Sequence, residues 1–103
     1  MDNQPIAHIR CMTAQKTAST TWTEAYSGSS ALEGRKQVIL YNRSVRKLYW
    51  SFSDPNNLTA AADVRSCNAI AAGAYLALNV SSNIPVYIRT GTLTAKVIVN
   101  ELA

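Results

Sequence analysis

Apolar and polar residues alternate in short runs along most of this chain of 103 residues, and no run keeps the period of a helix. Such alternation places every second side chain on the same face of an extended strand. Turn residues separate the runs, and they include the glycines at positions 28, 34, 73 and 91. Short strands at this spacing are typical of an antiparallel sandwich or barrel. The sequence therefore predicts an all-β chain, an antiparallel β-sandwich (jelly-roll-like) of about eight short strands.

The expected strands lie around or within residues 6–11, 17–26, 35–42, 46–53, 68–71, 75–80, 85–89 and 93–101. One short helical turn is expected over residues 60–64. A length of 103 residues argues for one domain. We therefore expect residues 1–16 to form an N-terminal arm or edge strand, and residues 17–103 to form a single β-sandwich domain.

The C-terminal part of the sequence predicts a hairpin with its turn at Thr90-Gly91. In that register Ile88 lies opposite Leu93. Ile98 is the one apolar residue on the polar face, which suits cover for a neighbouring strand or a contact between subunits. The inward face then carries Val86, Ile88, Ala95, Val97 and Val99.

The segment "RKQVILYNRSVRKLYW" predicts a second hairpin. A two-residue turn over 43–44 pairs Gln37 with Trp50. A three-residue loop over 43–45 pairs Val38 with Trp50, and it is preferred because it separates aliphatic from polar side chains better. The residues expected to point into the core are Val38, Leu40, Leu48 and Trp50.

The same segment holds five cationic residues and no acid, and it predicts a candidate partner interface. Its outer face keeps apolar and aromatic side chains exposed beside the cations of the turn, a mixture that resembles an interface more than a solvent face. A solvated tip that discourages strand edges from pairing is the alternative explanation for the charges. The candidate interface residues are Arg43, Arg46, Lys47, Ile39, Tyr41 and Tyr49.

Nucleic-acid binding is a further hypothesis for this segment. Small β-barrels bind single strands through aromatic side chains on one face and cations along a groove. However, the whole chain has ten Lys and Arg against six Asp and Glu, a net charge of only +4. Trp50 also shares its parity with Leu48 and Phe52, which is a core pattern. A partner protein is therefore preferred to nucleic acid.

Carbohydrate binding is the remaining binding hypothesis. Trp22 and Tyr26 lie beside the loop "SGSS" and are candidate sugar contacts, because exposed aromatic rings stack on sugars. The preferred alternative is that Trp22 packs inside the sandwich.

The sequence offers no pattern of catalytic, cofactor-binding or metal-binding residues. The motifs GxSxG, GxxxxGK[ST] and GxGxxG are absent, and His8 is the only histidine. Cys11 and Cys67 lack the CxxC spacing of a metal site. The two could form a disulfide with each other, but free, buried thiols are preferred. The N-terminus has no signal-peptide pattern, and no apolar run approaches the roughly 20 residues that span a bilayer. We expect a non-enzymatic chain with no cofactor and no membrane partner.

Four segments carry a resemblance to a known group, namely "LYNRS", "LYWSF", "NAIAAGAYLALNV" and "IPVYIRTGTLTAKVIVNELA". Together they resemble small virion proteins of tailed bacteriophages, in which a glycine-centred hairpin leads into a final Val-rich strand with an acidic end. Glu101 is the acidic residue here. The resemblance covers residues 32–103 and transfers no functional residue, because its motif positions are packing positions.

The resemblance implies a structural β-sandwich that decorates or cements a capsid, often as a trimer. Other members form neck, tail or fibre parts, with a receptor- or carbohydrate-binding role as the alternative. The chain lacks an obvious tail-fibre repeat, so the decoration type is preferred. The implied partners are the major capsid protein or other virion subunits and further copies of the chain, with a trimer favoured. The implied location is the virion, after assembly in the host cytoplasm.

Overall fold

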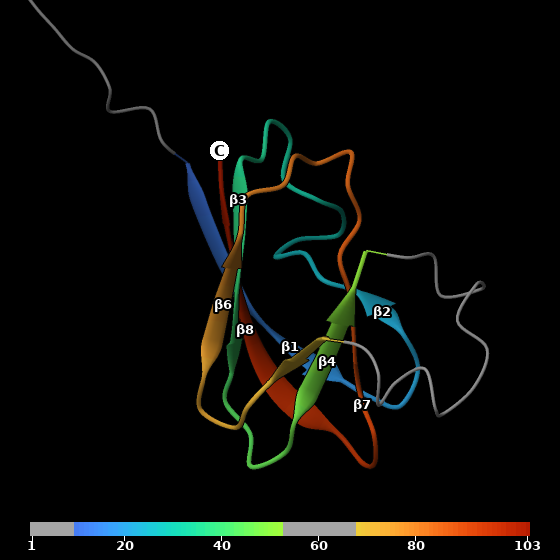
Figure 1. Cartoon of the computed structure of the whole chain (residues 1–103). Coiled ribbons are helices and arrows are strands. Elements are labelled where there is room, and N and C mark those ends of the chain that lie inside the picture. The colour runs from blue at the N-terminus through green and yellow to red at the C-terminus, as the bar shows by residue number, and fades with distance from the viewer. Residues whose placement is uncertain (1–9, 53–67) are drawn as a thin grey trace, which may run out of the picture.

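The computed structural model describes residues 10–52 and 68–103, and this part of the chain contains eight strands and no helix. Figure 1 shows the strands packed as two layers. The strands are β1 (Cys11–Ala18), β2 (Thr23–Glu24), β3 (Gln37–Asn42), β4 (Leu48–Ser51), β5 (Asn68–Ile70), β6 (Tyr75–Leu78), β7 (Tyr87–Thr90) and β8 (Ala95–Leu102). The predicted all-β sandwich is confirmed. The helical turn expected over 60–64 lies outside the described residues, as does His8.

The strands pair as one long antiparallel ribbon that is rolled up. β1 pairs with β8, β2 with β7, β3 with β6, and β4 with β5. Successive pairs of this ribbon fall in alternate sheets. The strand orders are β1-β8-β3-β6, here called sheet A, and β2-β7-β4-β5, here called sheet B. This winding is the jelly-roll arrangement, so it gives the predicted sandwich a definite topology.

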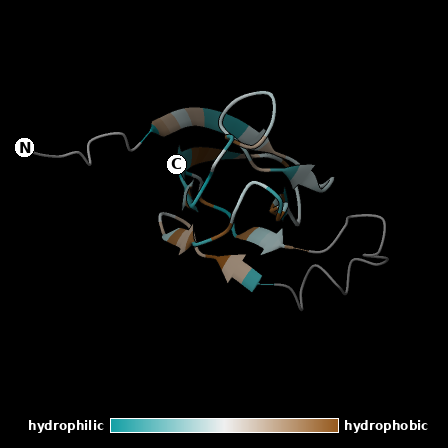
Figure 2. Ribbon diagram, turned by 90° about the horizontal axis from the view of Figure 1, so that it is seen from above, coloured by the Kyte–Doolittle hydropathy of each residue, from teal (hydrophilic) through white to brown (hydrophobic). Residues whose placement is uncertain are grey.

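The core lies between the two sheets and is built from small and medium aliphatic side chains. Burying each larger one stabilises the fold by about 1.5–3 kcal/mol. Figure 2 shows hydrophobic stretches in the strands of both layers. Trp50 packs against this core and meets Phe52 edge to face, with ring centroids 5.2 Å apart. The buried hydrophobic residues are Ala18, Ala25, Val38, Leu40, Leu48, Ile70, Val86, Ile88, Ala95, Val97 and Val99.

The two predicted hairpins do not form, although their strands and their inward residues are correct. β3 and β4 lie in different sheets, and so do β7 and β8. Val38 lies opposite Leu78 and Glu101 rather than opposite Trp50. In a rolled ribbon, consecutive strands belong to successive turns of the roll. The short connections therefore cross between the sheets, and the inward residues of both strands still meet in one core.

Buried polar residues hold these crossings in place. Asn42 is fully buried, and its Nδ2 donates to the carbonyl oxygens of Arg46 at 2.7 Å and Ile70 at 3.0 Å. At the other crossing, the buried Thr90 donates from Oγ1 to the Leu93 carbonyl oxygen at 2.6 Å. Leu93 adopts a left-handed φ of 55° there. These bonds satisfy polar groups that a hairpin would have paired along its ladder.

Near the start of the described residues, β1 covers Cys11–Ala18. Of the strand expected over 6–11, residues 6–9 lie outside the described residues, and Cys11 begins β1. The expected strand over 17–26 is divided, because the chain leaves sheet A after Ala18 and enters sheet B at Thr23. β1 is an edge strand: of its inward residues Met12 is exposed, Ala14 and Lys16 are half-buried and Ala18 is buried. Its alternation of apolar and polar residues is weak. β1 also runs across the expected boundary between residues 16 and 17 without a break.

Candidate partner interface

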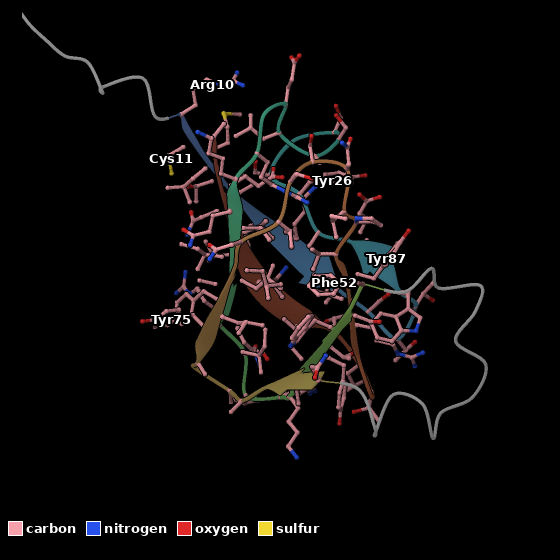
Figure 3. The ribbon with its side chains drawn as sticks, turned by 45° about the horizontal axis from the view of Figure 1, so that its top comes forward. Arg10, Cys11, Tyr26, Phe52, Tyr75 and Tyr87 are labelled. Atoms are coloured by element: carbon pink, nitrogen blue, oxygen red, sulfur yellow. The ribbon has the colours of Figure 1, made fainter. Side chains whose placement is uncertain are left out.

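The outer face of sheet A, which points away from sheet B, is broad and almost uncharged. Two rows of side chains cross all four strands, Gln15–Ile98–Tyr41–Tyr75 and Thr13–Asn100–Ile39–Ala77. Lys96 is the one charged side chain that the strands place on this face. Tyr75 is 72% exposed and Tyr41 is 38% exposed. Figure 3 shows Cys11 and Tyr75 on this side of the molecule.

The tip loop, residues 43–47, adjoins one end of this face and carries three cations. Arg43 and Lys47 are exposed, while Arg46 is half-buried and donates from Nη1 to the Thr94 carbonyl oxygen at 3.4 Å. The backbone N–H of Arg43 donates to the Lys96 carbonyl oxygen at 3.0 Å, which brings Lys96 to the same end. Within the described residues, the acids Glu33 and Glu101 lie at the opposite end of sheet A, where β8 finishes.

The structure brings together most of the predicted interface but not all of it. Ile39 and Tyr41 lie on the outer face of sheet A beside the tip loop. Tyr49 belongs to β4, and its side chain lies on the outer face of sheet B, next to Arg89. The predicted patch is therefore divided between the two sides of the sandwich, because β3 and β4 are in different sheets.

Tyr75 and Ile98 complete the face, and the sequence indicated only Ile98. Ile98 stands out as an apolar residue on a polar parity, and it lies between Gln15 and Tyr41. Tyr75 begins β6 and lies directly opposite Tyr41. Nothing local to its segment shows that β6 pairs with β3, so Tyr75 was missed.

The candidate sugar contacts, Trp22 and Tyr26, do not share a platform. The Arg89 guanidinium lies over the Trp22 ring, 5.7 Å from its centroid. The Lys16 Nζ lies over the Tyr26 ring at 4.6 Å, and Lys16 also donates to the Gly28 carbonyl oxygen. Each ring thus contacts a cation from a different sheet, an arrangement that fixes its position.

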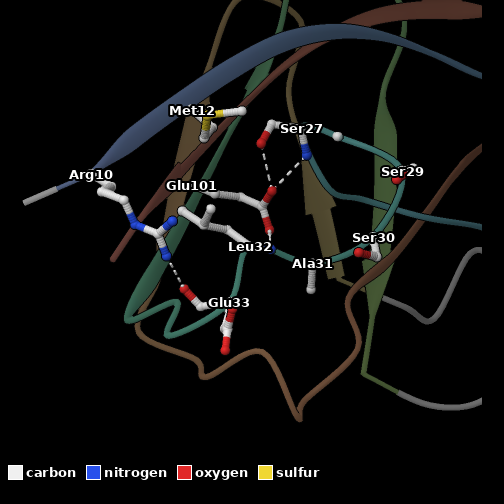
Figure 4. Close-up of a pocket in the computed structure, with 10 residues that line it drawn as sticks. Arg10, Met12, Ser27, Ser29, Ser30, Ala31, Leu32, Glu33 and Glu101 are labelled. Carbon is white, nitrogen blue, oxygen red and sulfur yellow. Dashed lines mark hydrogen bonds between the residues drawn. The ribbon is translucent and has the colours of Figure 1, made fainter.

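An open pocket of about 280 Å³ lies at the other end of the sandwich, and Figure 4 shows its lining. Glu101 at its base is fully buried. Its Oε1 accepts from the N–H and the Oγ of Ser27, both at 2.6 Å, and its Oε2 accepts from the Leu32 N–H at 3.1 Å. The Arg35 Nη1 donates to Oε2 at 2.9 Å.

These partners hold Glu101 as a carboxylate. Burial alone raises its pKa, but the hydrogen bonds from Ser27, Leu32 and Arg35 outweigh burial, so the pKa lies below the ordinary value of 4.5. Arg10 at the rim donates from Nη2 to the Glu33 carbonyl oxygen at 2.7 Å. Because the carboxylate and both guanidinium groups already have partners, this end of the sandwich suits a structural role.

The described residues were also compared with the requirements of a metal site and of a membrane-spanning helix, and they include one of the two cysteines. Within 10–52 and 68–103, no three His, Cys, Asp or Glu side chains lie close enough to hold a metal ion. The same residues contain no helix long and apolar enough to cross a membrane. Cys11 is free, and it is exposed on the edge strand rather than buried as predicted. Cys67 lies outside the described residues.

Comparison of the chain with protein-family models, with curated proteins and with solved structures finds no match. The face of sheet A and the tip loop are therefore interpreted from their own geometry.

Proposed function

We propose that this chain is a non-enzymatic structural protein of a bacteriophage virion, of the kind that decorates or cements the capsid. The observation that carries the proposal is the outer face of sheet A together with the tip loop. A broad, almost uncharged face with exposed tyrosines can be buried against a protein with little desolvation cost. The cations of the adjoining tip loop then select an acidic surface.

The fold and the resemblance of residues 32–103 to small phage virion proteins support the same proposal. Jelly rolls occur in viral capsid proteins and also in lectins, so the fold alone does not separate the two. The lectin alternative is less well supported because Trp22 and Tyr26 contact separate cations. On this proposal the partner is the major capsid protein or another virion subunit.

The test measures co-sedimentation of the purified chain with empty shells made from the major capsid protein of the same genome. Arg43→Glu with Lys47→Glu reverses two exposed charges of the tip loop. We expect this pair to weaken shell binding at least about tenfold at low salt, because like charges then meet across the contact. Tyr41→Ser with Tyr75→Ser should weaken binding at all salt concentrations.

The matched control is Arg10→Glu with Lys36→Glu, which changes the net charge equally but lies at the other end of sheet A. It should bind shells as the wild type does. Absence of binding by the wild-type chain would refute the proposed function. Salt-dependent binding to a single-stranded oligonucleotide that is lost in the tip-loop variant would assign these cations to nucleic acid instead.

A further inference from the structure

The free edge of sheet A borders the proposed shell-binding face, and its open backbone groups point sideways, in the plane of the sheet. β1 is the end strand of the order β1-β8-β3-β6, and within the described residues it pairs only with β8. It is eight residues long, Cys11–Ala18, whereas the opposite edge strand β6 has four. A long open edge is a template for adding a further strand.

The register shows which backbone groups of β1 point away from β8. Arg10 and Ala103 exchange both backbone hydrogen bonds, at 3.1 and 2.9 Å, so they form a hydrogen-bonded pair. Such pairs alternate along an antiparallel ladder. The even-numbered residues of β1 therefore bond to β8, and the odd-numbered ones direct their N–H and C=O groups to the open side. These outward residues are Cys11, Thr13, Gln15 and Thr17.

The four outward residues of this edge are themselves uncharged. Proteins commonly protect open edges with lysines or prolines. The only charged residue of β1 is Lys16, and the Gly28 carbonyl oxygen and the Tyr26 ring hold its ammonium group. The side chains of all four outward residues are exposed. The edge is thus long and open among the described residues, and the one cation bonded to an outward side chain is Lys96 of β8, whose Nζ donates to the Thr17 Oγ1 at 3.1 Å.

We propose that the occupant of this edge is β1 of a second copy of the chain, paired antiparallel about a twofold axis. The register that the backbone supports places Ala14 opposite Ala14 of the second copy. Thr13 then lies opposite Gln15 of the second copy, and Cys11 opposite Thr17. Each outward N–H and C=O group of both strands finds a partner in this arrangement, and a continuous eight-stranded sheet results.

Charge and side-chain size favour this register over its neighbours. Lys16 lies opposite Met12 of the second copy, and the two small Ala14 side chains meet on the axis. A shift by two residues in one direction would place Lys16 opposite Arg10, and like charges directly opposite each other destabilise a strand pair. The same shift in the other direction would leave the Cys11 backbone beyond the end of the partner strand.

The pairing does not depend on the proposed virion role. A chain that dimerises but ignores shells would refute the role and leave the contact intact, while a monomer that binds shells would do the reverse. The contact is twofold and symmetric, so it also differs from the trimer that the resemblance favours.

Disulfide trapping tests the register. In a background carrying Cys11→Ser and Cys67→Ser, we expect Ala14→Cys to form a disulfide-linked dimer under mild oxidation. Residues directly opposite in a non-hydrogen-bonded pair have Cα atoms about 4.5 Å apart, within the range of a disulfide. Met12→Cys alone should not cross-link, because the two copies of residue 12 lie about 13 Å apart along the strands.

A mixture of the Met12→Cys and Lys16→Cys proteins should cross-link, since these positions lie opposite each other. A cross-link at Met12→Cys alone, or none in Ala14→Cys, would overturn the proposed register.

Paired charges test the contact without cysteines. Thr13→Lys with Gln15→Lys places like charges opposite each other, and we expect it to raise the dimer Kd at least about tenfold. Thr13→Lys with Gln15→Glu, the matched control, places opposite charges there and should keep the dimer. Sedimentation from about 1 μM to about 1 mM would measure this. A wild-type monomer or trimer throughout, or equal Kd values for both variants, would overturn the proposal.

Discussion

Replacing Arg35 with Met should destabilise the protein severely, because its guanidinium is a buried junction between three parts of the chain. Both Arg35 and Glu101 have fully buried side chains, joined at 2.9 Å. The Arg35 Nη2 also donates to the carbonyl oxygens of Ser81 at 2.9 Å and Ile84 at 2.8 Å. Arg35 thus ties the start of β3 to the end of β8 and to the connection between β6 and β7.

The expected loss is about 3–5 kcal/mol, because removing one partner of a buried pair leaves the other charge uncompensated. A domain of this size is stabilised by only about 5–15 kcal/mol in total. The variant should therefore melt at least about 12 °C lower, at about 4 °C for each kcal/mol. Met keeps most of the apolar volume, so the loss measures the charge and its hydrogen bonds.

Urea unfolding followed by tryptophan fluorescence measures the free energy of unfolding. The matched control is Lys36→Met, which removes an exposed cation from the next residue and should change stability by less than about 0.5 kcal/mol. A loss below about 1 kcal/mol in Arg35→Met, with an unchanged m-value, would refute the reasoning, because a charge with solvent access costs little to unpair.

Two further predictions concern buried polar groups. The pKa of Glu101 lies below 4.5 in the folded chain, so its contribution to stability is present above that pH and is lost as the pH falls through the folded pKa. Urea midpoints should fall on acidification in the wild type and in the exposed Glu33→Gln control, and less in Glu101→Gln; identical slopes in all three would contradict this. Asn42→Leu should cost about 2–4 kcal/mol, because the carbonyl oxygens of Arg46 and Ile70 lose their donor. Asn79→Leu, an exposed asparagine, should stay within about 0.5 kcal/mol of the wild type, and a similar cost for both variants would show that Asn42 is not a buried junction.

Much of the candidate interface was predictable, and the remainder depended on strand pairing. The tip loop cations and the outward parity of Ile39 and Tyr41 follow from alternation within one segment. Tyr75 reaches them only because β6 pairs with β3, across more than thirty residues of chain. Tyr49 has the parity expected of an outward residue, but its strand belongs to the other sheet. The face on which a side chain lies is set within its own strand, whereas its neighbours on that face depend on which strands pair.

The buried charges were the least predictable feature. Glu101 ends a Val-rich strand, where an acid suggests an exposed terminus, and Arg35 begins a segment whose cations were assigned to the surface. Their pairing needs the start of β3 beside the end of β8, a contact over 66 residues of sequence. Asn42 similarly resembles a turn residue in the sequence, and its burial depends on the crossing between sheets.

By itself the sequence determined that the chain is an all-β sandwich, where most strands lie and which side chains point inward. Alternation sets these properties within each strand. Leu40 and Leu48 would point inward in the predicted hairpin, and they also point inward in the structure, where the chain crosses between the sheets. The tertiary structure alone decided that consecutive strands occupy different sheets. That choice rests on contacts between distant residues, the bonds of Asn42 to β5 and of Arg35 to Glu101 among them. The periodicity within one segment contains no information about such partners.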